Sequence, residues 1–95
     1  MYARVTHFKV DPSRLPELSA KIKQMGPPAK TLPGMIDAYA AWRADGQGVV
    51  VALYQSKGDA DRAVTRIQAL WGDLVLLLSG APRTDVYENA EHVTR

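Results

Sequence analysis

Apolar residues along this chain follow two periods, which predict alternating strands and helices. Residues 2–10 alternate between two sets of side chains, as a strand does. Beyond Ser13, which can cap a helix, apolar residues recur at spacings of three and four, the pattern of an amphipathic helix. The sequence Gly26-Pro27-Pro28 predicts the end of this helix. The apolar stripe consists of Leu15, Leu18, Ile22 and Met25.

The same order of elements then recurs. A turn at Pro33-Gly34 leads into a predicted strand over residues 35–43, and a hairpin loop with glycines joins it to a strand over residues 49–55. Ser56 and Asp59 have the spacing of a capping box, which predicts the start of a second helix.

The second helix is expected to end before Gly80-Ala81-Pro82, and residues 83–88 predict a last short strand. A polar tail follows at residues 89–95. The order strand-helix-strand-strand-helix-strand predicts one α+β domain over residues 1–95, with the ferredoxin-like β-α-β-β-α-β arrangement and a four-stranded antiparallel sheet.

The third predicted strand is apolar on both faces. A strand with one face in water should alternate apolar and polar residues. Two helices cover only one face of such a sheet, and an uncovered apolar face would be a large adhesive patch. A second copy of the chain is the simplest cover, so the sequence predicts a homodimer; a different protein partner is the alternative. The two sets of residues are Val49, Val51 and Leu53 on one face and Val50, Ala52 and Tyr54 on the other.

Composition narrows the classes of function. Of 95 residues, 46% are hydrophobic and 23% charged, as in an ordinary globular domain, and the absence of cysteine excludes disulfides and thiol chemistry. The net charge is only +2, without a basic cluster, so nucleic-acid binding is not expected. No apolar run approaches the ~20 residues of a membrane span, and the opening residues lack a signal-peptide core. We therefore expect a cytoplasmic protein without a membrane partner.

Several segments carry a family resemblance. They are residues 3–6 (ARVT) with 10–12 (VDP), residues 32–35 (LPGM), residues 48–56 (GVVVALYQS) and residues 85–88 (DVYE). Together they resemble the antibiotic biosynthesis monooxygenase-like (ABM-like) domains of the dimeric α+β barrel superfamily, many of which have Trp at the position of Tyr54. The resemblance covers nearly the whole chain and is one of fold pattern more than of chemistry.

The resemblance implies a homodimer in which two subunits together form a dimeric α+β barrel. Each subunit would have a pocket between its sheet and its helices. Some characterised members oxidise aromatic polyketides with O2 and no cofactor, whereas others degrade haem through a histidine on a helix. Neither predicted helix here contains a histidine, which argues against the haem-degrading branch. We therefore expect no cofactor. We expect no metal either, because His7 and His92 lie far apart without acidic residues at ligand spacing.

Two residues are candidates for acid–base chemistry. His7 would remove a phenolic proton and so produce an electron-rich anion that reacts with O2, because the pKa of imidazole lies near neutrality. Asp37 is the second candidate base. The alternative for His7 is a hydrogen-bonded strand histidine at the rim of the sheet, and the alternative for Asp37 is a polar strand end paired with Arg43.

Four residues are candidates for binding an aromatic substrate. Tyr39, Trp42 and Tyr54 would line the pocket, and Arg43 would bind a carboxylate or phenolate. Tyr39 and Trp42 are three positions apart, so they are expected on opposite faces unless a bulge intervenes. The alternative for the aromatic residues is packing in the core or an interface.

These residues leave two classes of function open. The first is an ABM-like enzyme, a cofactor-independent monooxygenase or relative, acting on a small aromatic or quinone-like molecule. The second is a module of the same fold that binds a small molecule without turnover, or a homo-oligomer without a ligand. The enzyme hypothesis expects a pocket that holds His7 or Asp37 beside a tyrosine or arginine.

Overall fold

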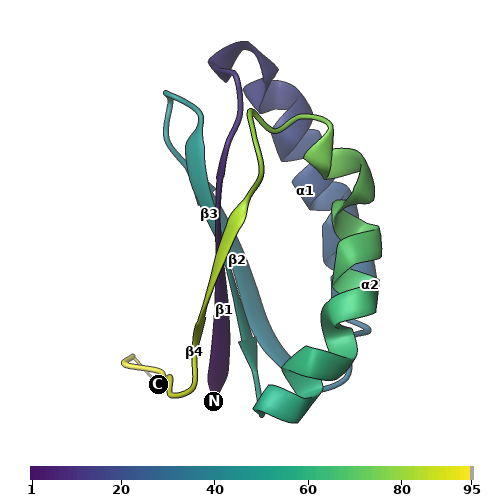
Figure 1. Ribbon diagram of the computed structural model, residues 1–95, viewed down its shortest axis with the longest axis vertical. Coiled ribbons are helices and arrows are strands. Elements are labelled where there is room, and N and C mark those ends of the chain that lie inside the picture. The colour runs from purple at the N-terminus through teal and green to yellow at the C-terminus, as the bar shows by residue number, and fades with distance from the viewer. Residues whose placement is uncertain (95) are drawn as a thin grey trace.

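The computed structural model describes residues 1–94, with the exception of the side chain of Asp73. Four strands form one antiparallel sheet in the order β2-β3-β1-β4, and both helices lie on the same face of it (Figure 1). This is the predicted ferredoxin-like α+β fold. In chain order the elements are β1 (Tyr2–Lys9), the 3-10 helix η1 (Pro12–Arg14), α1 (Leu15–Ala29), β2 (Met35–Trp42), β3 (Gln47–Tyr54), α2 (Lys57–Val75) and β4 (Arg83–Tyr87).

The start of the first helix differs from the prediction. The capping residue is Asp11, whose carboxylate accepts hydrogen bonds from the Ser13 backbone N–H at 2.9 Å and from its hydroxyl at 2.7 Å. These bonds hold the pKa of Asp11 below its usual value. The cap opens a 3-10 turn, and α1 begins only after it, so Ser13 lies inside the turn.

The end of α1 also differs, because the helix continues through Pro27 and Pro28 to Ala29. Proline lacks the N–H that would bond four residues back, which leaves the carbonyl groups of Lys23 and Gln24 without helical donors. Both residues are exposed, so water can supply the missing hydrogen bonds. The backbone N–H of Lys30 closes the last turn by donating to the Gly26 carbonyl at 3.1 Å.

A β-bulge in β2 changes which residues share a face. Met35 pairs with Tyr54, and Asp37 already pairs with the next residue back, Leu53, so the register shifts at Ile36. Simple alternation would place Met35 on the same face as Tyr39, but the bulge puts Met35 on the helix side of the sheet, the face that also holds Tyr54.

The predicted capping box at the start of α2 is present in modified form. The Ser56 hydroxyl accepts from the Asp59 backbone N–H at 3.2 Å and lies 3.0 Å from the Asp59 carboxylate. Arg62 donates to the same carboxylate at 2.6 Å, and these bonds hold the pKa of Asp59 below its ordinary value. The short Asp side chain also packs directly against Gly34, where any side chain would collide with it.

The hydrophobic core consists of two clusters at opposite ends of the sheet–helix interface. One cluster is built on Tyr54 and the other on Phe8. The first contains Tyr2, Leu32, Tyr54, Ala60 and Ala63, and the second contains Phe8, Val10, Leu18, Leu74 and Leu77. Between them the sheet and helices are not in full contact, and this gap defines the site described below.

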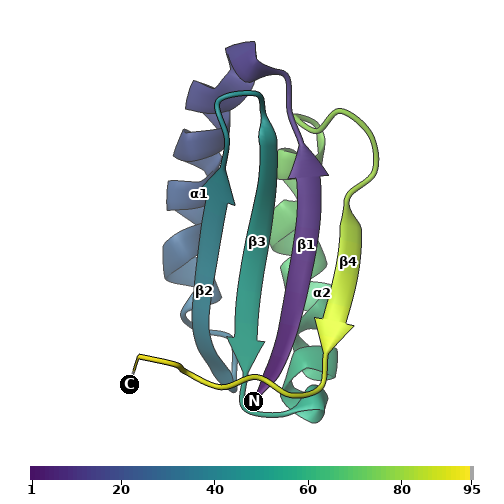
Figure 2. The ribbon, with the colours of Figure 1, turned by 90° about the vertical axis from the view of Figure 1, so that its left-hand side faces the viewer.

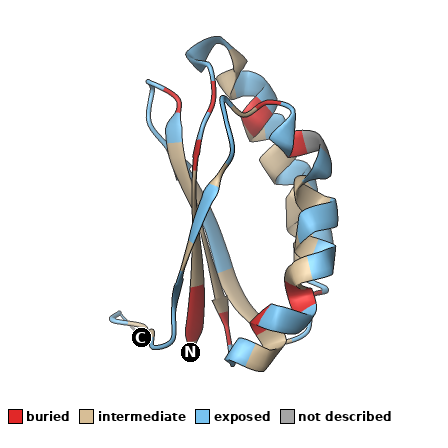
Figure 3. Ribbon diagram, viewed as in Figure 1, coloured by how far each residue is buried: buried red, intermediate tan, exposed pale blue. Residues whose placement is uncertain are grey.

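The sheet face opposite the helices, here called the open face, carries no helix (Figures 1 and 2). The C-terminal segment crosses one end of it, past the start of β1 and the end of β3 (Figure 2). Ala3 at that end is only 6% exposed, whereas the central residues Val5 and Val51 are half-buried (Figure 3 shows burial along the ribbon). No helix in the described residues combines the length and the hydropathy needed to span a membrane.

Candidate functional site

A cavity of about 510 Å³ lies between the sheet and the two helices, in the gap between the core clusters. Its floor lies close to the backbone of the sheet because small residues occupy the helix-facing positions in the middle of the sheet. Ala52 pairs with Ala38 across β2 and β3, and Ala40 pairs with Val50 one position further along that face. Alanine fills little of the space under the helices, so a chamber remains where a larger side chain would complete the core.

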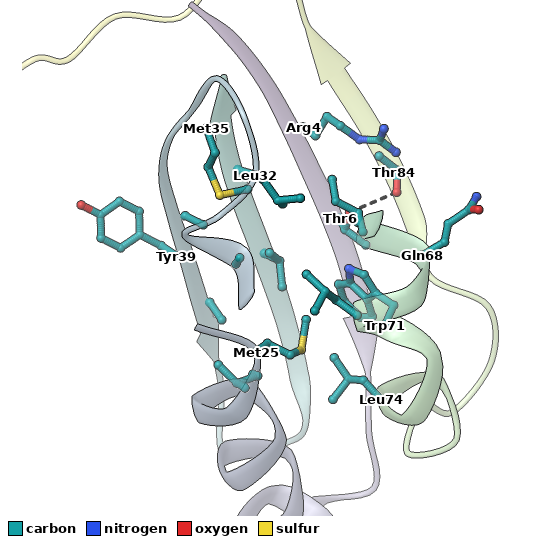
Figure 4. A pocket seen from close by; sticks show the side chains of 18 of the residues that line it. Arg4, Thr6, Met25, Leu32, Met35, Tyr39, Gln68, Trp71, Leu74 and Thr84 are labelled. Carbon is teal, nitrogen blue, oxygen red and sulfur yellow. Dashed lines mark hydrogen bonds between the residues drawn. The ribbon is translucent and has the colours of Figure 1, made fainter. Parts of the chain in front are cut away.

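The walls of the cavity are apolar (Figure 4). Helix α1 contributes Ile22 and Met25, and α2 contributes Ile67, Leu70 and Trp71. The indole of Trp71 stands edge-on to Phe8, with ring centroids 6.2 Å apart and an interplanar angle of 67°. This contact fixes Trp71 as a wall, because Phe8 belongs to the packed cluster behind it.

Tyr54 supplies a buried polar group to this cavity. The residue is fully buried, and its hydroxyl makes no hydrogen bond with any described residue. Burial raises the pKa of Tyr54, and the positive charge of Arg4 partly opposes that shift. A buried hydroxyl without a partner costs about 1–3 kcal/mol, so a bound molecule that accepts its proton or donates to its oxygen would recover that energy.

The other polar residues of the lining are Arg4, Thr6, Thr84, Gln68 and Tyr39. Arg4 pairs with Ala52 across the strands, which places it on the floor beside Tyr54. Thr6 and Thr84 form a hydroxyl–hydroxyl contact of 3.1 Å between β1 and β4 (dashed in Figure 4). All other charged side chains of the described residues lie outside the lining.

The two candidate bases lie on the open face, outside this cavity. His7 is 44% exposed, and its Nε2 lies 3.5 Å from a carboxylate oxygen of Asp85. Asp37 accepts a hydrogen bond from the Tyr39 hydroxyl at 3.1 Å. The sheet therefore separates both groups from Tyr54 and Arg4. Their catalytic roles stay predictions, and they would apply only to a molecule bound on the open face.

The four predicted binding residues are not brought together. Tyr54 lines the cavity. Tyr39 borders it from β2, but its ring points away from it and is 63% exposed (Figure 4). Trp42 lies on the helix side at the far end of β2, opposite Gly48 and outside the lining. Arg43 is exposed beyond β2 and also lies outside it.

The main feature that sequence analysis missed is the alanine floor. Ala38 and Ala40 alternate in β2, and Ala52 lies in a run of larger residues in β3. Small residues at core-facing positions are a signal of space, but the signal is readable only once the register of β2 is known. Among the described residues, no group of three His, Cys, Asp or Glu side chains is arranged to hold a metal ion.

The order of elements and the antiparallel sheet define a ferredoxin-like α+β fold, which can be compared with known proteins. No protein-family model matches the sequence, and no curated protein matches it. Solved structures do match: 81 chains share the fold at high significance.

Three of these structures illustrate the likeness. A candidate antibiotic biosynthesis monooxygenase from Caulobacter crescentus has a TM-score of 0.81 and 19% identity, over 95% of this chain and 90% of its own. SnoaB, a cofactor-independent oxygenase from Streptomyces nogalater, was determined as an N63A mutant. It has a TM-score of 0.77 and 14% identity, over 99% of this chain and 97% of its own. Rv0793 from Mycobacterium tuberculosis has a TM-score of 0.77 and 19% identity, over 98% of both chains. At these identities the likeness shows the fold.

Proposed function

We propose that this protein binds a small aromatic or quinone-like molecule in the cavity between sheet and helices. The observation that carries the proposal is the fully buried, unpartnered Tyr54 hydroxyl in the lining of a mostly apolar chamber. A chamber of about 510 Å³ is within the usual range for ligand sites, which are mostly apolar with a few placed polar groups.

The reaction we propose is a cofactor-independent monooxygenation, which the structural likeness to SnoaB supports. Without an external reductant, all four electrons that reduce O2 must come from the organic substrate. Oxidation of a ring methylene to a carbonyl meets this balance: CH2 and O2 give C=O and H2O. The apolar walls would exclude water from such a reaction, and Tyr54 would hold the substrate oxygen in place.

A module that binds without turnover is the second candidate. It is favoured by one observation: no carboxylate or imidazole of the described residues lines the cavity, so a protein base is missing there. The two candidates share the ligand site and differ only in oxygen consumption. A cytoplasmic location is proposed for both.

One experiment tests binding and turnover together. The Trp42→Phe variant leaves Trp71, in the cavity wall, as the single tryptophan. Its fluorescence would be titrated with 1,4-naphthoquinone to detect binding, and oxygen uptake would be followed with anthrone to detect turnover. Saturable quenching with oxygen uptake supports the monooxygenase, and quenching alone supports the binding module. No saturable quenching by either compound contradicts the proposed site.

Tyr54→Phe is expected to change stability and binding in opposite directions. Removing the unpartnered hydroxyl should stabilise the free protein by about 1–3 kcal/mol, because its desolvation is no longer uncompensated. The affinity for 1,4-naphthoquinone should fall about tenfold, the usual scale for one lost hydrogen bond. Thermal unfolding and the Trp71 titration measure the two effects. Tyr87→Phe, on an exposed tyrosine, should change neither stability nor affinity. If Tyr54→Phe binds the quinone as tightly as the wild type, the Tyr54 hydroxyl does not contact the ligand.

We also propose that the open face is the interface of a homodimer. Its middle is an apolar surface on β1 and β3, formed by Val5, Val49 and Val51, and Leu53 extends it toward the end that the C-terminal segment crosses (Figure 2). Polar groups that satisfy one another flank this surface. The carboxylate of Asp85 lies 3.5 Å from both His7 and Arg83 on one side. An apolar centre with a polar rim is the usual anatomy of a protein interface.

Val51→Asp should dissociate this dimer. Val51 lies between Val5 and Tyr39 in the middle of the open face, and symmetry places the new charge in the interface twice. We expect dimerisation to weaken about hundredfold or more, on the scale of two lost valine burials. Sedimentation velocity measures the change, with Thr65→Asp on the exposed side of α2 as control. A wild-type protein that sediments as a monomer at micromolar concentration would contradict the proposed interface.

A further inference from the structure

We propose that the ligand of the cavity is an organic anion: an apolar ring system with one carboxylate or acidic phenol, ionised at neutral pH and paired with Arg4. This inference rests on the proposed binding function and specifies the chemical class of the ligand. It is carried by the position and the missing partners of Arg4.

Arg4 differs from most other arginines of the described chain. Arg14, Arg62, Arg66 and Arg83 each lie within 3.5 Å of a carboxylate or hydroxyl oxygen. The Arg4 side chain forms no hydrogen bond or ion pair with any described residue, although it is half-buried in the cavity lining and extends toward Thr84 on β4 (Figure 4). A cation removed from water without a counter-charge is unfavourable, so an anion bound beside Arg4 would supply the missing counter-charge.

The chemistry of the two polar groups sets the sign of the ligand charge. A guanidinium group only donates hydrogen bonds, and the unpartnered Tyr54 hydroxyl has a proton to donate. A ligand that satisfies both must present acceptor oxygens. No described acidic side chain lines the cavity, so a bound anion meets a positive charge and no negative one. Charge-assisted hydrogen bonds of this kind are stronger than neutral ones.

The strand register gives the site a direction. Tyr2 pairs with Tyr54 and Arg4 with Ala52, so Arg4 and Tyr54 are diagonal neighbours on the helix side of two adjacent strands. Trp71, by contrast, packs against Phe8 in the cluster at the other end. An elongated ligand would therefore place its charged group between Arg4 and Tyr54 and its ring against Trp71.

The lining also indicates how the anion would form. Since no described imidazole or carboxylate reaches this chamber, the ligand must lose its proton to water before it binds. Acids that are already ionised at neutral pH meet this condition, and Arg4 favours their charged form once they are bound. A weakly acidic alcohol does not meet it.

Two probes of the same shape and different charge test the inference. 2-Naphthoate and the neutral 2-naphthalenemethanol would be titrated into the Trp42→Phe protein, and Trp71 fluorescence would report binding. We expect naphthoate to bind about tenfold to hundredfold more tightly, the scale of a charge-assisted pair. This comparison needs no change at Arg4, so it does not depend on whether an Arg4 variant folds.

Variants then assign the preference to one residue. Arg4→Met should abolish the preference for naphthoate, and Arg4→Lys should retain part of it. Arg43→Met is the matched control, because it removes the same charge at an exposed position outside the cavity, and it should leave the preference unchanged. Loss of the preference in Arg43→Met and not in Arg4→Met would overturn the inference.

The outcomes separate this inference from the proposed function. Equal affinities for the two probes overturn the anion proposal and leave the aromatic site standing. If 1,4-naphthoquinone and both naphthalene probes fail to bind, the proposed function falls and the anion proposal with it. Tighter binding of naphthoate that depends on Arg4 supports both.

Discussion

Ala52→Leu is expected to close the cavity and to stabilise the protein at the same time. Ala52 lies in the middle of the cavity floor, between Arg4 and Ala38 on the neighbouring strands. Three added carbons would occupy space that the core now leaves open, for a gain of up to about 2 kcal/mol at 0.8 kcal/mol per buried methylene. The same carbons take the place of a bound ring, so the affinity for 1,4-naphthoquinone should fall about a hundredfold, as overpacking a site commonly costs 1–3 kcal/mol.

Chemical denaturation and the Trp71 titration measure these two effects of Ala52→Leu. Ala41→Leu is the matched control, because it makes the same change on the open face of β2, where Ala41 pairs with Val49. It should leave affinity unchanged. If Ala52→Leu binds the quinone as tightly as the wild type, the ligand lies elsewhere and the cavity is not its site.

Gly46→Ala is expected to cause the largest loss of stability among single-methyl changes in this chain. Gly46 has a φ of +93°, a conformation that strains residues with a side chain, and an added Cβ would collide with the backbone carbonyl oxygen of Val10. The same contact includes a 2.9 Å hydrogen bond from the Val10 N–H to the Gly46 carbonyl, which joins the β2–β3 hairpin to the end of β1. We expect a loss of about 2–4 kcal/mol and a fall in Tm of roughly 10–20 °C.

Two other glycines separate the causes of that loss. Gly80 has a φ of +98° but open space around its Cβ position, so Gly80→Ala should show the backbone strain alone, about 1 kcal/mol. Gly72 lies in helix α2 with open space and no positive φ, so Gly72→Ala should stabilise by up to about 1 kcal/mol. If Gly46→Ala costs no more than Gly80→Ala, the contact with Val10 does not hold the hairpin.

The faces of β1 and β3 could be predicted from sequence because both strands pair without a bulge. Alternation within each strand correctly separated Arg4 from His7 in β1 and Tyr54 from Val51 in β3, and the observed pairing then puts Arg4 and Tyr54 on the same face. The separation of Tyr39 from Trp42 also followed from parity, since both lie beyond the bulge of β2. Element order, the Pro33-Gly34 turn and the hairpin between β2 and β3 depended on short-range signals, which is why the topology was predictable.

Other features depend on tertiary contacts that no local pattern reveals. The bulge at Ile36 moves Met35 to the helix side because the pairing with β3 shifts there. The continuation of α1 through Pro27 and Pro28 places Gly26 and Ala29 at the cavity, against the usual preference of proline. His7 was a candidate base because of its chemistry. Alternation along the strand could not show that His7 lies on the face opposite the cavity.

The division of the core has a consequence for how such a protein can change over time. The tightly packed ends, built on Tyr54 and Phe8, carry the fold, whereas the alanines between them contribute little to it. Substitutions at Ala38, Ala40 and Ala52 can therefore reshape the chamber without dismantling the scaffold. Members of one lineage could therefore diverge in the ligands they bind while their fold stays constant. Very dissimilar sequences can share one fold in this way.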